Sequence, residues 1–232
     1  MSAVVRPAAR RVGHETYAGG FRLVWTALAV NLLLALTTSP LLAVLGLLTD
    51  PVAAWPRVLA VSVVCGPALV GAFGVFAAPD EPVGRTFWSA YRSGWRRGLA
   101  VWAAAAAAVG VLGVDVAGAL TGSGAAWAGP LLPLFLVGIV VVVAVAAFAL
   151  VAAVELPDAR FGALLRACVF LVVRRWYLAL VSVAVLGLLA AAVVTHPVVG
   201  ALLACSPLLY VVFGNARYAL STAVGGPDPE HV

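Results

Sequence analysis

The chain has 232 residues, of which 64% are hydrophobic and only 10% are charged, and its mean hydropathy is +1.12. A water-soluble domain cannot bury so much apolar surface, so the composition excludes a soluble globular protein and indicates lipid as the solvent. All 14 basic residues are arginine and they flank apolar segments, which favours a role at the membrane over nucleic-acid binding despite the net charge of +5.

A bilayer core about 30 Å thick is crossed by a helix of about 20 apolar residues. Six long apolar runs of about this length follow one another: Leu23 to Leu48, Val58 to Ala78, Leu99 to Leu120, Leu131 to Val154, Tyr177 to Val194, and Val198 to about Ala219. The first run is too long for a cleaved signal peptide. The sequence therefore predicts an all-α, polytopic bundle of six spans over residues 22–220, between an N-terminal tail (1–21) and a C-terminal tail (221–232).

The first span carries polar residues inside the membrane. Asn31 lies close to the midplane, where it needs a partner; an interhelical hydrogen bond is the simpler interpretation and ligand binding is the alternative. We expect Thr37, Thr38 and Ser39, which precede Pro40, to satisfy carbonyls that a proline kink releases.

The arginines predict how the spans are oriented. Of the 14, 13 lie before the first span, in the connections after the second and fourth spans, or at the end of the sixth, and only Arg57 lies on the other side. Because positive residues are retained in the cytoplasm, both termini are predicted to be cytoplasmic. The absence of lysine beside abundant Ala, Gly, Val, Pro and Arg is typical of a GC-rich bacterial genome, which favours a bacterial plasma membrane.

The connections predict three hairpins, because outward loops are short or uncharged whereas inward connections are longer and basic. Pro79-Asp80 stands 17 residues before Arg96-Arg97, and Pro157-Asp158 stands 17 residues before Arg174-Arg175. Parallel repeats build some transporters. In a chain so rich in Ala, Val and Leu such matches also arise by chance, and both explanations stay open.

The first inward connection is sharply amphipathic as a helix. One face carries Arg85, Ser89, Arg92 and Arg96, and the other carries Phe87, Trp88, Tyr91 and Trp95. A lead-in helix that anchors the next span at the membrane interface explains this pattern. A docking surface for a cytoplasmic partner is the sharper hypothesis, and its candidate residues are Arg85, Trp88, Arg92, Trp95, Arg96 and Arg97.

The second inward connection repeats this arrangement less cleanly, with Arg160, Arg166 and Arg174 set against Leu164, Leu165, Cys168 and Val172. The sequence thus predicts two cytoplasmic amphipathic connecting helices. Asp115 is the acid that lies well inside an apolar run, near the outer end of the third span. It is a candidate for substrate or proton binding, although its side chain also lies within reach of interfacial water.

No phosphate-binding loop, His-Glu-x-x-His or Gly-x-Ser-x-Gly motif occurs in the sequence, so we expect neither an enzyme nor a cofactor. His14, His196 and His231 are too scattered to predict a metal site. For the three cysteines, small apolar packing is the simpler interpretation, and a bridge between Cys65 and Cys205 is the alternative.

Several of these residues carry a resemblance. They are Asn31-Leu32-Leu33-Leu34 followed by Pro40, then Arg85-Thr86-Phe87-Trp88 with Tyr91-Arg92 and Trp95-Arg96-Arg97, and finally Pro207 with Asn215, Arg217 and Tyr218. From about Phe21 to Leu220 the chain resembles the YesL-like family of bacterial integral membrane proteins. The resemblance implies a gene neighbourhood with sugar-uptake ABC transporters and brings no catalytic residues. The outward segment from Thr49 to Arg57 is longer than the compact form of that family.

The first functional hypothesis is a non-enzymatic accessory protein that contacts membrane lipids and helps or regulates a carbohydrate ABC transport system, with no nucleic-acid partner. The alternative is a small permease with a polar path near Asn31 and Asp115. A membrane enzyme is the third and least supported class, because the motifs for it are missing.

Overall fold

The computed structural model describes residues 11–50, 52–121, 128–197 and 200–223, and every regular element among them is helical. The elements are α1 (Arg11–Thr37), α2 (Ser39–Leu47), α3 (Trp55–Val61), η2 (Ser62–Val64), α4 (Cys65–Ala77), α5 (Val83–Thr121), α6 (Ala128–Glu155), α7 (Phe161–Arg174), α8 (Trp176–Thr195), the π-helical turn η3 (Gly200–Ala204) and α10 (Cys205–Ala223). The predicted all-α fold is confirmed. Because α1 begins at Arg11, the described end of the predicted N-terminal tail is helical and continues into the first span.

Five helical segments in the described part of the chain are long and apolar enough to cross a membrane. They are Trp55–Ala77, Val83–Thr121, Pro130–Glu155, Trp176–Thr195 and Gly200–Thr222. A bent pair, Val24–Thr37 with Ser39–Leu47, passes the same test as one unit but turns by 69° between its halves. The chain therefore has the helices of a multi-pass membrane protein with five spans, or six if the bent pair forms one span.

The bend in the predicted first span lies at Thr38, just before Pro40. Thr37 donates its hydroxyl hydrogen bond to the carbonyl of Leu33 (2.8 Å), and Thr38 donates to Leu34 (2.7 Å). A threonine hydroxyl that donates to the carbonyl four residues earlier bends a helix. Proline interrupts the backbone hydrogen bonds of the helix at the same place. Pro40 frees the carbonyl of Leu36, and the threonines bind the carbonyls of Leu33 and Leu34, so the described hydrogen bonds do not show the expected role.

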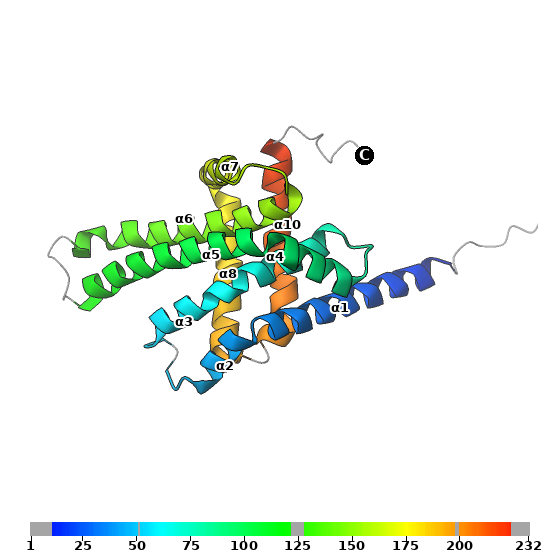
Figure 1. Cartoon of the computed structure of the whole chain (residues 1–232), viewed down its shortest axis with the longest axis horizontal. Helices are drawn as coiled ribbons and strands as arrows, with labels where there is room; N and C mark the ends of the chain where they lie inside the picture. Colours follow the sequence, from blue (N-terminus) through cyan, green and yellow to red (C-terminus); the bar gives the residue numbers. More distant parts are fainter. Residues whose placement is uncertain (1–10, 51, 122–127, 198–199, 224–232) are drawn as a thin grey trace, which may run out of the picture.

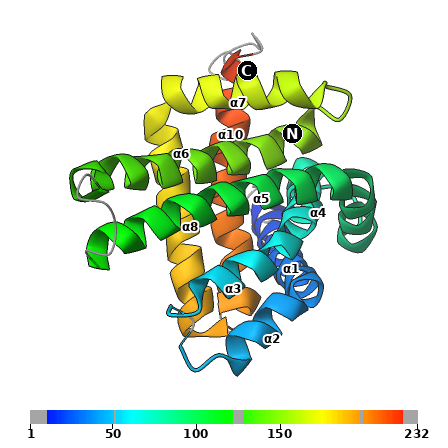
Figure 2. The same ribbon diagram turned by 60° about the vertical axis from the view of Figure 1, so that its left-hand side comes forward.

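The helices form two groups in space. Helices α4, α5 and α6 run broadly alongside one another, whereas α8 and α10 lie side by side and cross them steeply (Figures 1 and 2). The two groups consequently tilt differently against any single membrane plane. In Figure 1 the α4–α5 and α6–α7 connections lie towards the right and top, and the α2–α3 connection and the far ends of α5 and α8 lie towards the left and bottom. The two inward connections thus lie on the opposite side of the molecule from the α2–α3 connection and the far ends of α5 and α8.

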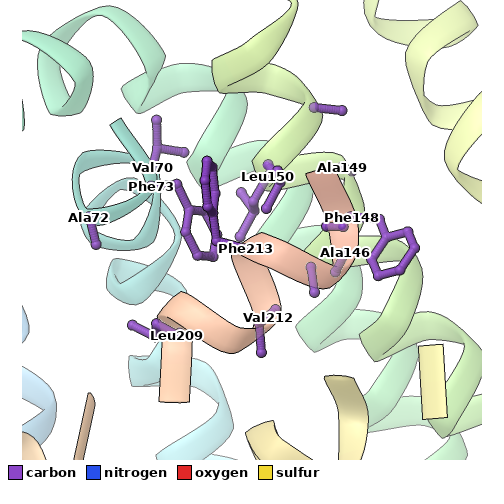
Figure 3. Packing of buried hydrophobic residues seen from close by; sticks show 14 of the residues in the cluster. Val70, Ala72, Phe73, Ala146, Phe148, Ala149, Leu150, Leu209, Val212 and Phe213 are labelled. Carbon is purple, nitrogen blue, oxygen red and sulfur yellow. The ribbon is translucent and has the colours of Figure 1, made fainter. Parts of the chain in front are cut away.

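The core lies where α4, α6 and α10 meet (Figure 3). Phe73 of α4 stacks on Phe213 of α10 with 6.0 Å between ring centroids, and Leu150 of α6 lies beside them. The stretch of α6 from Ala146 to Ala153 is buried over its whole circumference. Lipid tails are as apolar as these side chains, so close packing and not water exclusion holds this core together.

The two inward connections fold differently from each other, which corrects part of the prediction. The first is not a separate interfacial helix, because its residues are the opening turns of the 39-residue helix α5. Figure 2 shows these turns nearly end-on and out of line with the rest of α5. The second connection is a helix of its own, α7, which a non-helical residue, Arg175, separates from α8.

Candidate functional site

The opening turns of α5 are clamped against α4 by a seam of small residues. A Cβ atom on Gly94 would lie 2.5 Å from Val70, and one on Gly98 would lie 3.0 Å from the carbonyl oxygen of Gly66. Gly74 packs in the same way against Ala90. Small residues let two helix backbones approach closely in a membrane. The seam therefore fixes which side of α5 faces outward.

The outward side of these turns carries three exposed arginines, Arg85, Arg92 and Arg96, which we call the arginine side of α5. The ion pairs among the described residues are Arg22 with Asp80 and Arg217 with Glu155, and no arginine of this side donates a described hydrogen bond. The three positive charges are thus uncompensated within the described part of the chain. Gly84, Arg85, Trp88, Ser89, Arg92 and Ser93 line an open hollow on this surface.

The aromatic residues of the same turns do not form one opposite face, as the sequence pattern suggested. Phe87 is fully buried against Gly71, whereas Trp88 is 42% exposed and Trp95 is 47% exposed. Trp88 is held edge-on to Phe87 and to Tyr91, with ring centroids 6.1 and 5.4 Å apart. The two tryptophans therefore lie beside the arginine side, because α4 covers the strip through Phe87, Ala90 and Gly94.

Arg97 does not belong with the other arginines of the candidate site. Its guanidinium donates a hydrogen bond of 2.5 Å to the carbonyl of Pro157 in the α6–α7 connection. Arg22 makes the same kind of contact with the carbonyl of Pro79 (2.9 Å) and pairs with Asp80. In each of the first two hairpins, an arginine at the start thus donates a hydrogen bond to the carbonyl of a proline at the end.

Asn31 is 3% exposed and inserts its amide into another helix. Its Nδ2 donates to the carbonyl of Leu202 (2.8 Å), and its Oδ1 accepts from the backbone N–H of Ser206 (2.6 Å). In a regular α-helix those two backbone groups, four residues apart, would bond to each other. The asparagine takes the place of that bond where the π-helical turn η3 passes into α10, and a side chain inserted in this way opens a helix locally.

Asp115 lies on the exposed surface of the outer half of α5. No hydrogen bond or ion pair of its carboxylate is described. The described contacts of Asn31 run to η3 and α10, so they do not bring these two residues together. The polar path of the permease hypothesis therefore has no described contact to support it.

Sequence reasoning missed two polar contacts near the inner ends of α6, α8 and α10. Glu155 at the end of α6 lies 3.4 Å from the Nε of Arg217, whose guanidinium stands over the Phe213 ring at 5.8 Å. Asn215 donates to the hydroxyl of Ser182, which is fully buried on α8. The ion pair was indicated in the sequence, because an acidic residue lies at the inner end of one span and an arginine lies at the inner end of another.

The cysteines and histidines form no described site. Cys65, Cys168 and Cys205 are free thiols, which agrees with the packing interpretation. Outside the membrane spans, burial raises the pKa of Cys168 to about 11. Within the described residues no three His, Cys, Asp or Glu side chains are grouped closely enough to hold a metal ion. His231 lies outside the described residues, and so do Arg6 and Arg10 of the predicted N-terminal tail.

Comparison of the chain with protein-family models, with curated proteins and with solved structures gives no match. The resemblance to YesL-like proteins consequently stays a prediction. What the geometry establishes is an exposed cationic surface on α5, without an acceptor among the described residues, in a multi-pass helical protein.

Proposed function

We propose that this chain is a non-enzymatic accessory protein of a bacterial plasma membrane, which helps or regulates a carbohydrate ABC transport system through the arginine side of α5. In this proposal both termini and the inward connections are cytoplasmic. The transporter would then meet Arg85, Arg92 and Arg96 from the cytoplasmic side. The class of transporter comes from the YesL-like resemblance.

The observation that carries the proposal is the grouping of three exposed arginines on one side of α5 without a described acceptor. Arg22, Arg97 and Arg217 each contact an acceptor within the chain. The arginine side has no such acceptor among the described residues, yet the glycine seam with α4 holds its backbone in place. A positioned group of unpaired guanidinium groups suits the carboxylates of a partner protein, which bind arginine with two parallel hydrogen bonds.

Affinity purification from native membranes tests the proposal. The wild-type protein is expected to retain a component of a carbohydrate ABC transporter, and the double variant R92E/R96E is expected to lose it, because like charges would then face each other across the contact. The exposed Arg57 lies on the outward side, so R57E makes the same kind of charge change away from the surface and serves as the control.

Equal amounts of the variants in the membrane and equal thermal stability in detergent show that the charge change leaves the fold intact. Retention of every wild-type partner by a folded R92E/R96E protein would contradict the role of the arginine side. A wild-type protein that retains no carbohydrate-transport component would contradict the assignment of the partner.

A further inference from the structure

Helix α7 is apolar on both of its sides. Leu164, Cys168, Leu171 and Val172 are buried against the bundle. The opposite side exposes Leu165 (37%), Val169 (44%), Phe170 (60%) and Val173 (67%). A helix at the surface of a water-soluble domain carries polar residues on its outer side. The outer side of α7 therefore needs an apolar environment that the described part of the chain does not supply.

The charges on α7 are all positive. Its charged residues are Arg166 and Arg174, both exposed, and its sequence contains no acidic residue. The guanidinium of Arg174 stands 6.0 Å from the centre of the Phe170 ring, so a cation and an exposed aromatic ring lie together. Arginines beside exposed aromatic and aliphatic side chains match the phosphates and upper acyl chains of a leaflet that contains anionic lipid.

The place of α7 in the fold brings this side to the membrane boundary. Arg175 alone separates α7 from α8, which is one of the candidate spans. At the start of α8, Trp176 is 63% exposed and Tyr177 is 49% exposed, and these are the residue types that gather at membrane interfaces. Figure 2 shows α7 lying across the ends of α8 and α10 and not continuing either of them. Exposed apolar and aromatic residues thus occur on both sides of the Arg174–Arg175 junction, in α7 and at the start of the span.

The opening turns of α5 differ in this respect, although the sequence pairs the two connections. Ser89 and Ser93 lie among the exposed arginines there, so the outward side of α5 is polar. The two connections therefore suit different surroundings, aqueous for the arginine side of α5 and lipid for the outer side of α7.

We propose that α7 lies in the plane of the membrane surface, with Leu165, Val169, Phe170 and Val173 among the upper acyl chains and Arg166 and Arg174 on the phosphates of anionic phospholipids. This lipid contact is independent of the proposed transporter partner. It makes α7 an anchor that holds the inner ends of α8 and α10 at the boundary.

Site-directed spin labelling in lipid nanodiscs tests the proposal. Single cysteines are placed at Val169 and Val173 on α7, with Ser89 and Ser93 on α5 as matched controls, after the native cysteines have been replaced by alanine. The relaxation of each label by oxygen, which concentrates in lipid, is compared with its relaxation by a water-soluble nickel chelate. Each disc contains one copy of the protein, in phosphatidylcholine with or without phosphatidylglycerol.

The α7 labels are expected to be relaxed more by oxygen, and the α5 labels more by the nickel chelate. Phosphatidylglycerol is expected to move the α7 labels deeper, and R166E/R174E is expected to abolish that shift. Water-accessible labels at 169 and 173 in single-copy discs would overturn the anchor. The same would follow if protection of those labels required a second copy or an added protein. A depth that does not respond to phosphatidylglycerol would overturn the phosphate contact.

Discussion

At the scale of single residues, Asn31 has the best-defined role in the structure. Its amide replaces one backbone hydrogen bond of the helix that passes from η3 into α10, and both of its polar atoms are used in doing so. In a bilayer no water is available to satisfy the same two backbone groups. Asn31 is therefore better explained as a structural link between α1 and α10 than as a ligand-binding residue.

The substitution Asn31→Leu is expected to destabilise the protein by about 1–2 kcal/mol, because the carbonyl of Leu202 and the N–H of Ser206 lose their partner. Unfolding by increasing proportions of SDS in mixed micelles measures this change. The neighbouring Leu32 is 63% exposed, so Leu32→Ala is the control and is expected to have a much smaller effect. An N31L protein as stable as the wild type would show that the inserted amide does not contribute to the free energy of unfolding.

Cys168 is predicted to resist alkylation in the folded protein. Its side chain is fully buried, and burial raises its pKa from 9.0 to about 11 because the thiolate is desolvated. The raised pKa means that the thiol form is favoured by folding. This contribution to stability is fully present below pH 9 and is lost as the pH rises through about 11.

Mass spectrometry after treatment with iodoacetamide measures the reaction, in the folded protein and after denaturation in SDS. Modification of Cys168 at pH 8 is expected only after denaturation. Rapid modification of the folded protein at that pH would mean that α7 separates from the bundle in solution.

At the scale of elements, the contact between α4 and α5 depends on glycines more than on large side chains. A Cβ atom on Gly66 would lie 2.8 Å from the carbonyl carbon of Gly98 and from the Cβ of Trp102, and the backbone there cannot yield without moving one helix. The seam also orients the arginine side of α5. Damage to the seam is therefore expected to affect both stability and the proposed docking surface.

Gly66→Ala is expected to destabilise the protein by roughly 1–3 kcal/mol through overpacking. Gly84 lies on the same helix pair but has open space around it, so Gly84→Ala is the matched control. Alanine favours a helix by up to about 1 kcal/mol over glycine, and the control is expected to be neutral or slightly stabilising. Thermal unfolding in detergent compares the two variants. Equal melting temperatures would show that α4 and α5 are not in close contact.

The two inward connections show how far an element can be predicted from its sequence. The helical period of each was correct, because the spacing of arginines and apolar residues is a local property. Their contacts were not predictable, because the side of α5 that is buried depends on glycines of α4 that lie far away in the sequence. For the same reason, Trp88 and Trp95 ended beside the arginines and Arg97 turned towards Pro157.

At the scale of the whole molecule, the two inward connections lie on the opposite side from the α2–α3 connection and the far ends of α5 and α8, as three hairpins require (Figure 1). A bend of 69° divides the first predicted span between the last part of α1 and the short helix α2. The bent pair decides whether the two termini lie on the same side of the membrane. If it crosses the membrane, both termini lie on one side. If it enters the membrane and returns to the same side, the termini lie on opposite sides.

Reporter fusions at the C-terminus test the predicted six-span layout. A fluorescent protein that folds only in the cytoplasm is expected to be active when fused after Val232, and alkaline phosphatase, which needs the periplasm, is expected to be inactive. Fusions made after Asp50 are the control and should behave in the opposite way. An active C-terminal phosphatase would rule out an even number of spans with a cytoplasmic N-terminus.

The sequence by itself determined the solvent, the helical fold class and the positions of the apolar segments. Each of these depends on composition or on the spacing of neighbouring residues, which are present before the chain folds. It also singled out Asn31 and the arginines of α5 by residue type. The tertiary structure alone decided what those residues contact. The insertion of Asn31 beside Ser206, the close approach of Gly66 to Gly98 and the steep crossing of α8 and α10 over α4, α5 and α6 all join segments that are distant in sequence, and such contacts depend on packing in three dimensions.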